Sequence, residues 1–201
     1  MNFDPVGPLD LTALAKAHDF MLQLPDLEAG ESLTRAYLHW PGGGYCDRDG
    51  AYNCSTVFEN GTWLPEITHD PRCNAKQIAD GDDYAAHTYH RNSFAIGCAI
   101  NGMGPGDPIQ EHELEVFLAM VGAIAFKYNL DVAGRVESGE HAGEPVIMTH
   151  AEAAIADGYW PDRVDLAALP PDTDYTPQGA AATATGLRFK ARRYKLALGG
   201  P

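Results

Sequence analysis

Two histidines and an aspartate have the residue types of a catalytic metal site. His39 lies near the end of the apolar run "RAYLHW", and His150 ends the apolar run "PVIMTH". Asp165 follows fifteen residues after His150. Two neutral imidazoles and a carboxylate can hold zinc and leave its fourth tetrahedral position open to water. Because an open position distinguishes a catalytic zinc from a structural one, these residues predict metal-assisted hydrolysis with Zn²⁺ as cofactor.

Each of the three residues also has a structural interpretation. A histidine at the end of a strand is often a core residue whose ring nitrogens bond to backbone groups, which applies to His39 and His150. Asp165 could instead be the N-cap of a short helix beginning at "LAAL". His87 is the alternative third ligand if Asp165 has that role.

The elements that would position these residues alternate between strands and helices. Hydrophobic periodicity predicts helices over 10–24 and 110–129, with Asp10 as an N-cap, and a helical turn over 151–158 that Gly158 ends. Apolar or alternating runs predict strands over 34–40, 94–100, 145–150 and 186–198, and a hairpin over 51–67 that turns at Asn60-Gly61. Residues 69–92 and 170–186 are predicted loops. This order predicts a single α/β domain, a central mixed sheet flanked by helices.

The charge is divided unevenly along the chain. Residues 1–175 contain nine basic and all 28 acidic residues, whereas residues 176–201 contain five basic residues and no acidic one. An acidic body disfavours nucleic acid, because phosphate contacts require positive charge. We therefore expect a domain over 1–175 and a basic strand or tail over 176–201, packed on the same domain. That tail either contacts an anionic surface or is an edge strand whose charges oppose aggregation.

Four cysteines, Cys46, Cys54, Cys73 and Cys98, occur without CxxC spacing. A cysteine-ligated structural zinc is therefore not expected. The start "MNFDPVGPLD" lacks the pattern of a secretion signal, and no apolar run is long enough to span a bilayer. We expect synthesis in the cytoplasm with free thiols, the alternative being a bridge from Cys46 to Cys54 or Cys73 in the periplasm.

Three blocks in a fixed order, over roughly residues 34–166, carry a family resemblance. The first is "AYLHW" with His39, the second is "AHTYHRNSFAIGCAINGM" with His87 and Asn92, and the third is "VIMTH" followed by "RVD". With these blocks the chain resembles the zinc amidases that include N-acetylmuramoyl-L-alanine amidases, phage lysis amidases and peptidoglycan recognition proteins. The resemblance implies a mixed-sheet fold and the ligands His39, His150 and Asp165.

The resemblance also implies roles for other residues. His87 and Asn92 would bind the substrate, and Tyr52 would be the catalytic tyrosine of the phage-type members. Arg163 stands where the family usually has a lysine, so it would keep the charge near the reacting amide but could not donate a proton near neutral pH. The glutamate that some members carry after the "IGI" strand is absent, because the chain has Cys98 and Ala99 there.

These roles have structural alternatives as well. Tyr52 could be a half-buried strand aromatic, and Asn92 could cap a turn. Arg163 could be a surface partner of a nearby aspartate.

The implied activity is cleavage of the amide between N-acetylmuramic acid and L-alanine in peptidoglycan. A chain without a secretion signal fits a bacteriolytic phage enzyme (an endolysin) or an injected effector that acts in the periplasm or cell wall. Two alternatives remain: a recognition protein that binds peptidoglycan without cutting it, and a cytosolic amidase that recycles anhydro-muropeptides.

Overall fold

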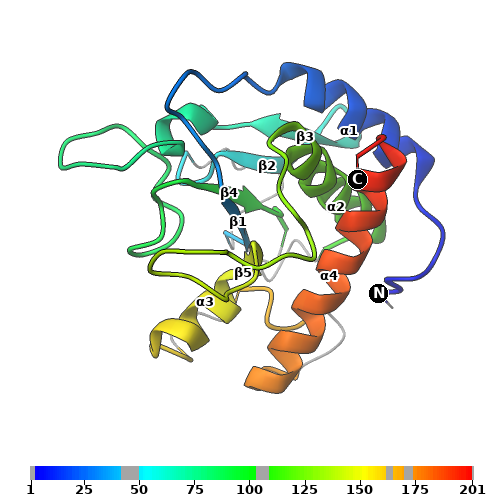
Figure 1. The fold of residues 1–201 in the computed structure, drawn as a ribbon. Coiled ribbons are helices and arrows are strands. Elements are labelled where there is room, and N and C mark those ends of the chain that lie inside the picture. The colour runs from blue at the N-terminus through cyan, green and yellow to red at the C-terminus, as the bar shows by residue number, and fades with distance from the viewer. Residues whose placement is uncertain (1–2, 42–49, 103–108, 162–164, 170–173, 201) are drawn as a thin grey trace.

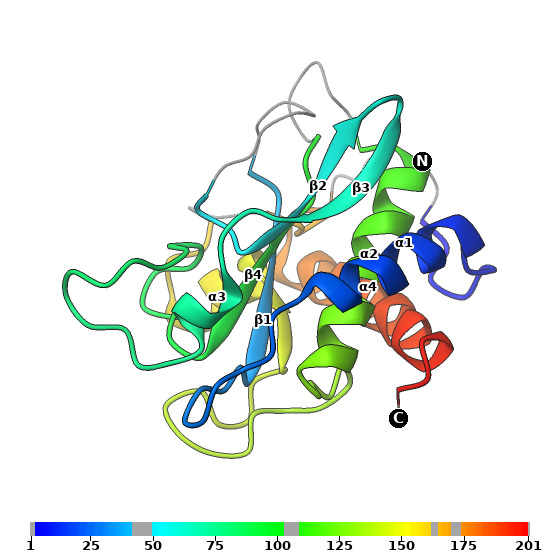
Figure 2. The same cartoon turned by 90° about the horizontal axis from the view of Figure 1, so that it is seen from above.

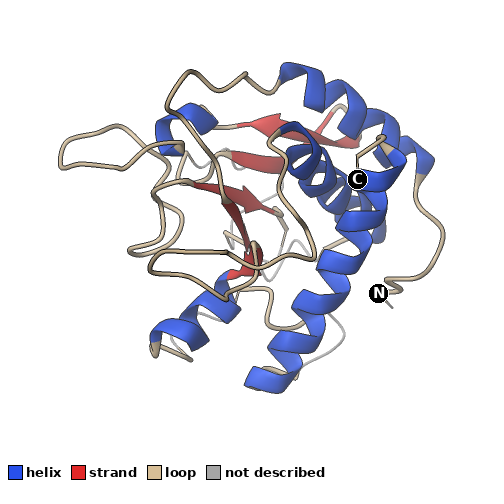
Figure 3. Ribbon diagram, viewed as in Figure 1, coloured by secondary structure: helices blue, strands red, loops and turns tan. Residues whose placement is uncertain are grey.

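The computed structural model describes residues 3–41, 50–102, 109–161, 165–169 and 174–200 of the chain, which form one α/β domain. Figure 1 labels the helices and strands, and Figure 3 colours them by type. In chain order they are α1 (Leu11–Gln23), β1 (Arg35–His39), β2 (Cys54–Glu59), β3 (Thr62–Ile67), the 3₁₀ helix η1 (Pro71–Asn74), β4 (Ala95–Ala99), α2 (Glu111–Lys127), β5 (Ile147–Thr149), α3 (His150–Asp157) and α4 (Pro177–Ala197).

The sheet is mixed, as the sequence predicts, and its strand order is β3-β2-β4-β1-β5. β1 pairs in parallel with β4 and β5, β4 pairs in parallel with β2, and β3 joins β2 as the antiparallel strand of the predicted hairpin. Asn60 and Gly61, with φ of 51° and 79°, form the hairpin turn. The carboxyl ends of β1, β4 and β5 therefore lie at one edge of the sheet, where ligands of open α/β sheets bind.

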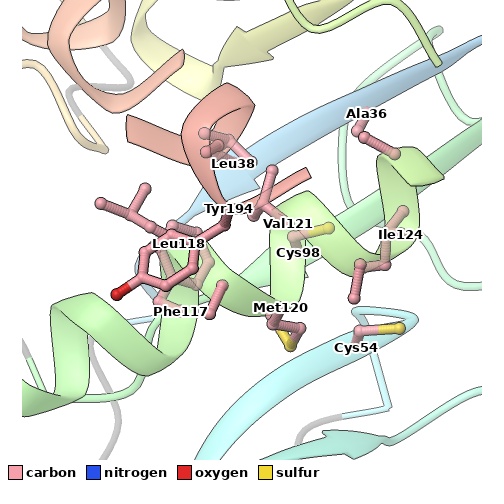
Figure 4. Packing of buried hydrophobic residues seen from close by; sticks show 14 of the residues in the cluster. Ala36, Leu38, Cys54, Cys98, Phe117, Leu118, Met120, Val121, Ile124 and Tyr194 are labelled. Atoms are coloured by element: carbon pink, nitrogen blue, oxygen red, sulfur yellow. The ribbon is translucent and has the colours of Figure 1, made fainter. Parts of the chain in front are cut away.

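One face of the sheet is packed against α1, α2 and α4, which gather on one side of it in Figure 2. Ala36, Leu38, Ile96, Cys98 and Ile147 contribute to this apolar core. Figure 4 shows how α2 and Tyr194 of α4 meet the strands there. Twelve residues of α2 are buried, and each fully buried large apolar side chain contributes about 1.5–3 kcal/mol. This face is the main source of stability.

The opposite face is lined by the alternate residues of the same strands. Tyr37, Ala95, Met148 and Ala153 of α3 form a small separate cluster there. His39 lies two residues beyond Tyr37 and therefore points to the same face. The polar segment 69–92, predicted as a loop, contains one short helix, η1, in the structure.

The C-terminal segment differs from the prediction, because residues 177–197 are the helix α4 rather than a loop followed by a strand. Its buried residues include Ala180, Ala184, Leu187, Ala191 and Tyr194, whose spacing of three to four residues fits one helix face. Thr176 caps the helix, accepting a hydrogen bond from the Gly179 amide. The alternation over 186–198 was a misleading signal, since the apolar positions also fit a period of 3.6.

The basic residues of α4 are largely engaged within the molecule. Arg188 pairs with Glu152, Lys190 with Glu115, Arg193 donates to backbone oxygens, and the buried Lys195 donates to the Leu130 carbonyl. The contact with an anionic surface thus remains a prediction from the sequence. Within the described part of the chain, none of the helices combines the length and apolar character needed to cross a bilayer.

Candidate metal centre

His39 and His150 meet because their strands are neighbours. His39 is the last residue of β1, and His150 is the first residue of α3, directly after β5. Leu38 and Thr149 are paired in register, so the two histidines leave the sheet side by side. Their ring centroids lie 4.7 Å apart. Thr149 caps α3 by accepting from the Glu152 amide, which fixes the direction in which His150 leaves the strand.

Asp165 reaches this edge from a distant loop. Its backbone oxygen accepts a hydrogen bond from the Ala151 amide at 3.2 Å, so residue 165 is docked on the start of α3. Its Oδ2 lies 2.9 Å from Nδ1 of His150 and 3.3 Å from Nδ1 of His39. No helix follows Asp165 in the described residues 165–169, so the alternative role as a helix N-cap is wrong.

The three donor atoms form a compact triangle. Its third edge, between the two Nδ1 atoms, is 3.1 Å. Bonds of about 2.0–2.2 Å from zinc to nitrogen or oxygen imply edges of about 3.3–3.6 Å between tetrahedral ligands. The triangle is therefore within a few tenths of an ångström of one face of a zinc tetrahedron. This residue group could hold a metal ion, as its composition predicts.

Burial and hydrogen bonding together set the protonation of this group. Burial lowers the pKa of the fully buried His39 to about 4, partly offset by the Asp165 carboxylate. Burial alone would raise the pKa of Asp165, but hydrogen bonds with His150 and His39 outweigh it and hold that pKa well below its usual range. At neutral pH the group thus offers a neutral imidazole at His39 and an ionised carboxylate, the forms that bind a cation.

Thr88 contacts the far side of His39. Its Oγ1 lies 3.2 Å from Nε2 of His39 and 3.0 Å from Nδ1 of His87. If the Nε2 proton of His39 is donated to Thr88, Nδ1 is left as a lone-pair donor facing His150 and Asp165. Such a bond behind a metal-binding histidine orients the ring and fixes its tautomer.

His87 lies between Thr88 and the sheet. An added Cβ on Gly97 of β4 would stand 2.5 Å from Cγ of His87, so the ring packs directly on the glycine backbone. Asn53 holds β4 at this point, since its Oδ1 accepts from the Gly97 amide at 2.8 Å. The close approach explains why a glycine follows Ile96 in the apolar run of β4.

A large open groove runs over the polar face. It has a volume of about 1540 Å³, and both His150 and Asp165 line it. The exposed fractions of their side chains are 9% and 11%, whereas that of His39 is 0%, so solvent reaches the triangle from one side. Aromatic residues also line the groove, among them Trp40, Tyr52, Tyr84, Tyr89 and Tyr159.

The predicted substrate-binding residues, His87 and Asn92, both line this groove. Asn92 also has a structural contact, because its Oδ1 accepts from the Thr88 amide at 2.9 Å. The Tyr52 ring lies 5.0 Å from the His39 ring and also borders the groove. Arg163 and Cys46 lie outside the described residues. The catalytic and binding roles of these four candidates, Tyr52, Arg163, His87 and Asn92, stay predictions.

The sequence analysis missed a charged clamp beside the site. The side chain of Arg91 is 1% exposed and forms ion pairs with Glu144 and with Asp157 of α3. It also donates to the hydroxyl of Tyr37 at 3.2 Å. The clamp joins the loop that carries Thr88 to the helix that carries His150. One arginine among acidic residues gives no signal of this kind in the sequence.

Comparisons with protein-family models, with curated proteins and with solved structures return no match. The family resemblance therefore remains a prediction based on the three sequence blocks.

Proposed function

We propose that the chain is a zinc-dependent hydrolase whose metal is held by His39, His150 and Asp165. The observation that carries the proposal is the triangle of donor atoms, with edges of 2.9–3.3 Å, at the wall of an open groove. Three protein ligands of this composition leave one coordination position for solvent or substrate, as in catalytic zinc sites. When bound, zinc supplies a Lewis acid and lowers the pKa of a bound water from about 15.7 to about 7.

The residues around the triangle have distinct tasks in this proposal. Thr88 holds the ring of His39 and its tautomer, and Asp165 reduces the positive charge of the site by one unit. Tyr52, beside His39, would donate a hydrogen bond to the reacting group from the groove side. Arg163, whose position lies outside the described residues, has its role from the family resemblance alone: it would add positive charge where negative charge develops on the scissile carbonyl.

The proposed substrate is peptidoglycan, cleaved at the amide between the lactyl group of N-acetylmuramic acid and L-alanine. Two features support it: the three sequence blocks, and an open groove whose volume of about 1540 Å³ has room for part of a glycan with its stem peptide. Aromatic walls provide apolar area with polar tips, which suits sugar rings and peptide groups that stay partly hydrated. The net charge of the whole protein, −14, makes a nucleic acid an unsuitable alternative polymer.

The test is turnover of a soluble muropeptide, followed by release of the free amino group of L-alanine. Metal-free protein should be inactive and zinc-reloaded protein active. His150→Ala should stay inactive after reloading, with an unchanged circular dichroism spectrum. Tight binding without turnover by zinc-loaded wild type would instead identify a recognition protein. If the zinc-loaded protein neither binds nor cleaves muropeptides, peptidoglycan is not its substrate.

A second comparison separates the two enzymatic settings. Intact sacculi should be solubilised by a lytic enzyme, whereas a recycling amidase should act on soluble anhydro-muropeptides and leave sacculi intact. Both reactions release the same amine, so one assay serves both substrates.

A further inference from the structure

A second group of metal-binding residue types is separate from the triangle, and its members are not among the described residues that line the groove. His69 follows β3, Cys73 lies in η1, and Asp83 lies in the loop after η1 (blue-green in Figure 1). One ligand atom from each residue can be chosen so that all three lie within 4.8 Å of one another. The three types together are those that bind zinc.

His69 presents a buried nitrogen that lacks a hydrogen-bond partner. Its Nε2 is buried and has no hydrogen bond among the described residues, although Oδ1 of Asp83 lies 3.7 Å away. The backbone holds the residue in place, because the His69 amide donates to the Asn53 carbonyl at 3.1 Å. A buried nitrogen without a partner costs free energy, and coordination of a cation would satisfy it.

Cys73 is held equally well by its helix. Asp70 caps η1, and the Cys73 amide donates to the Asp70 carbonyl at 3.1 Å. Burial raises the pKa of the Cys73 thiol, and the charges of Asp70 and Asp83 raise it further. The thiol is therefore protonated in the metal-free protein, and the same negative charges attract a cation that would displace the proton.

We propose that His69, Cys73 and Asp83 form a second divalent-cation site that takes zinc through one nitrogen, one sulfur and one carboxylate oxygen. The exposed fraction of the Asp83 side chain is 86%, so this carboxylate can rotate inward to complete the site. The thiolate makes the site suitable for a borderline-soft ion rather than Mg²⁺ or Ca²⁺. Because its donors are less closely arranged than those of the triangle, the second site binds zinc more weakly.

The position of this site indicates a structural role. Residues 77–81 and Tyr84 line the groove, and Asp83 belongs to the same loop. Asn74, next to Cys73, donates to the carbonyls of Ala85 and Asn92 and so holds the ends of the loop. A cation at this position would tie the tip of the loop to η1 and β3. The second zinc thus braces the wall of the groove and takes no part in the chemistry of the first.

Cobalt is the probe that distinguishes the two sites. Co²⁺ replaces zinc in both, and a thiolate ligand adds a sulfur-to-cobalt charge-transfer band in the near ultraviolet. The triangle has no sulfur, so this band reports the second site alone. Titration of reduced, metal-free protein should load two ions per chain, and the band should develop with the weaker one.

Matched variants assign the band. Cys73→Ser should abolish it and reduce the stoichiometry to one, and Asp83→Asn, at an exposed position, should weaken binding of the second ion only. His150→Ala should remove the other ion and keep the band. Cys46→Ser, the control cysteine variant, should also keep the band. A band that survives Cys73→Ser, or wild type that binds cobalt without a band, would overturn the proposal. Because the readout is spectroscopic, it is independent of whether the protein hydrolyses peptidoglycan.

Discussion

Leu38 and His39 are neighbours in the chain, yet they belong to opposite faces of the sheet. Leu38 packs into the apolar core against α2, whereas His39 faces a layer of imidazoles, hydroxyls and carboxylates. Both side chains are at most 1% exposed. Burial thus has two consequences in this protein. On one face it supplies stability, and on the other it fixes the positions and protonation of polar groups.

Substitutions of these two residues should have the largest effects, on zinc binding for one face and on stability for the other. His39→Ala removes a donor of the triangle, so zinc binding and muropeptide turnover should be lost. Leu38→Ala leaves a cavity in the core and should lower the free energy of unfolding by about 2–5 kcal/mol, with zinc still bound to the folded fraction. Metal analysis and chemical denaturation measure the two quantities. Loss of zinc from folded Leu38→Ala protein would show that the faces are not independent.

The next prediction tests whether the ion pairs of Arg91 stabilise the polar face. Arg91→Met removes the buried guanidinium that Glu144 and Asp157 share and should lower the free energy of unfolding by about 3 kcal/mol. Lys127→Met, which breaks the surface pair with the 93% exposed Asp26, should lower the free energy of unfolding far less, because solvent screens that pair. Denaturation at neutral pH compares both with the wild type. Equal costs would mean that the clamp acts as an ordinary surface pair.

The clamp should also depend on pH. Hydrogen bonding and charge from Arg91 lower the pKa of Asp157, and they lower that of Glu144 despite the opposing effect of burial. A lowered folded pKa gives stability that is complete above the unfolded value, about 4, and is lost as pH falls through the folded value. The difference between wild type and Arg91→Met should thus be constant near neutral pH and shrink below about pH 4.

A smaller effect tests the packing of His87 on the sheet. Gly97→Ala would place Cβ 2.5 Å from the imidazole, so the ring and its loop must move, at a cost of about 1–3 kcal/mol. Gly50→Ala is the matched control, since an added Cβ there meets nothing within 4 Å. Thermal denaturation of both variants is the measurement. A Gly97→Ala protein as stable as the control would mean that the loop carrying His87 can move away from β4 without loss of stability.

The smallest expected effect concerns Thr88, which alters metal affinity rather than stability. Thr88→Val keeps the shape of the side chain but removes the bond to Nε2 of His39, so zinc affinity should fall about tenfold to a hundredfold. Thr88→Ser keeps the hydroxyl and should retain most of the affinity. Competition with a chelator measures both. Equal affinity in the valine variant would assign Thr88 to packing alone.

Local patterns predicted most of the elements correctly. Asp10 caps α1 as expected, the Asn60-Gly61 turn joins β2 and β3, and Gly158 ends α3 in the left-handed conformation. Each depends on interactions between residues close in the chain. The prediction failed at α4, because residues 186–198 fit both an alternating and a 3.6-residue pattern, and packing of the helix against α2 decides between them.

The candidate site was predicted in part for the same reason. His39 and His150 end apolar runs, so their place at a sheet edge follows from pattern alone. Their contact depends on β1 and β5 being neighbours in the sheet, and no local sequence pattern predicts that strand order. The group of His69, Cys73 and Asp83 has a single faint sequence signal, the spacing of four residues between histidine and cysteine.

The sequence by itself determined which residues could donate to a metal and which face of each strand they occupy, because alternation and donor chemistry are properties of the residues. The tertiary structure alone decided that Asp165 closes the triangle, that Thr88 lies behind His39 and that Arg91 joins its loop to α3. The contacts of His39 with Thr88, of Arg91 with Asp157 and of His39 with Asp165 link residues 49, 66 and 126 positions apart in the chain. Strand order and loop docking bring them together, and both result from burial of the whole core rather than from any short segment.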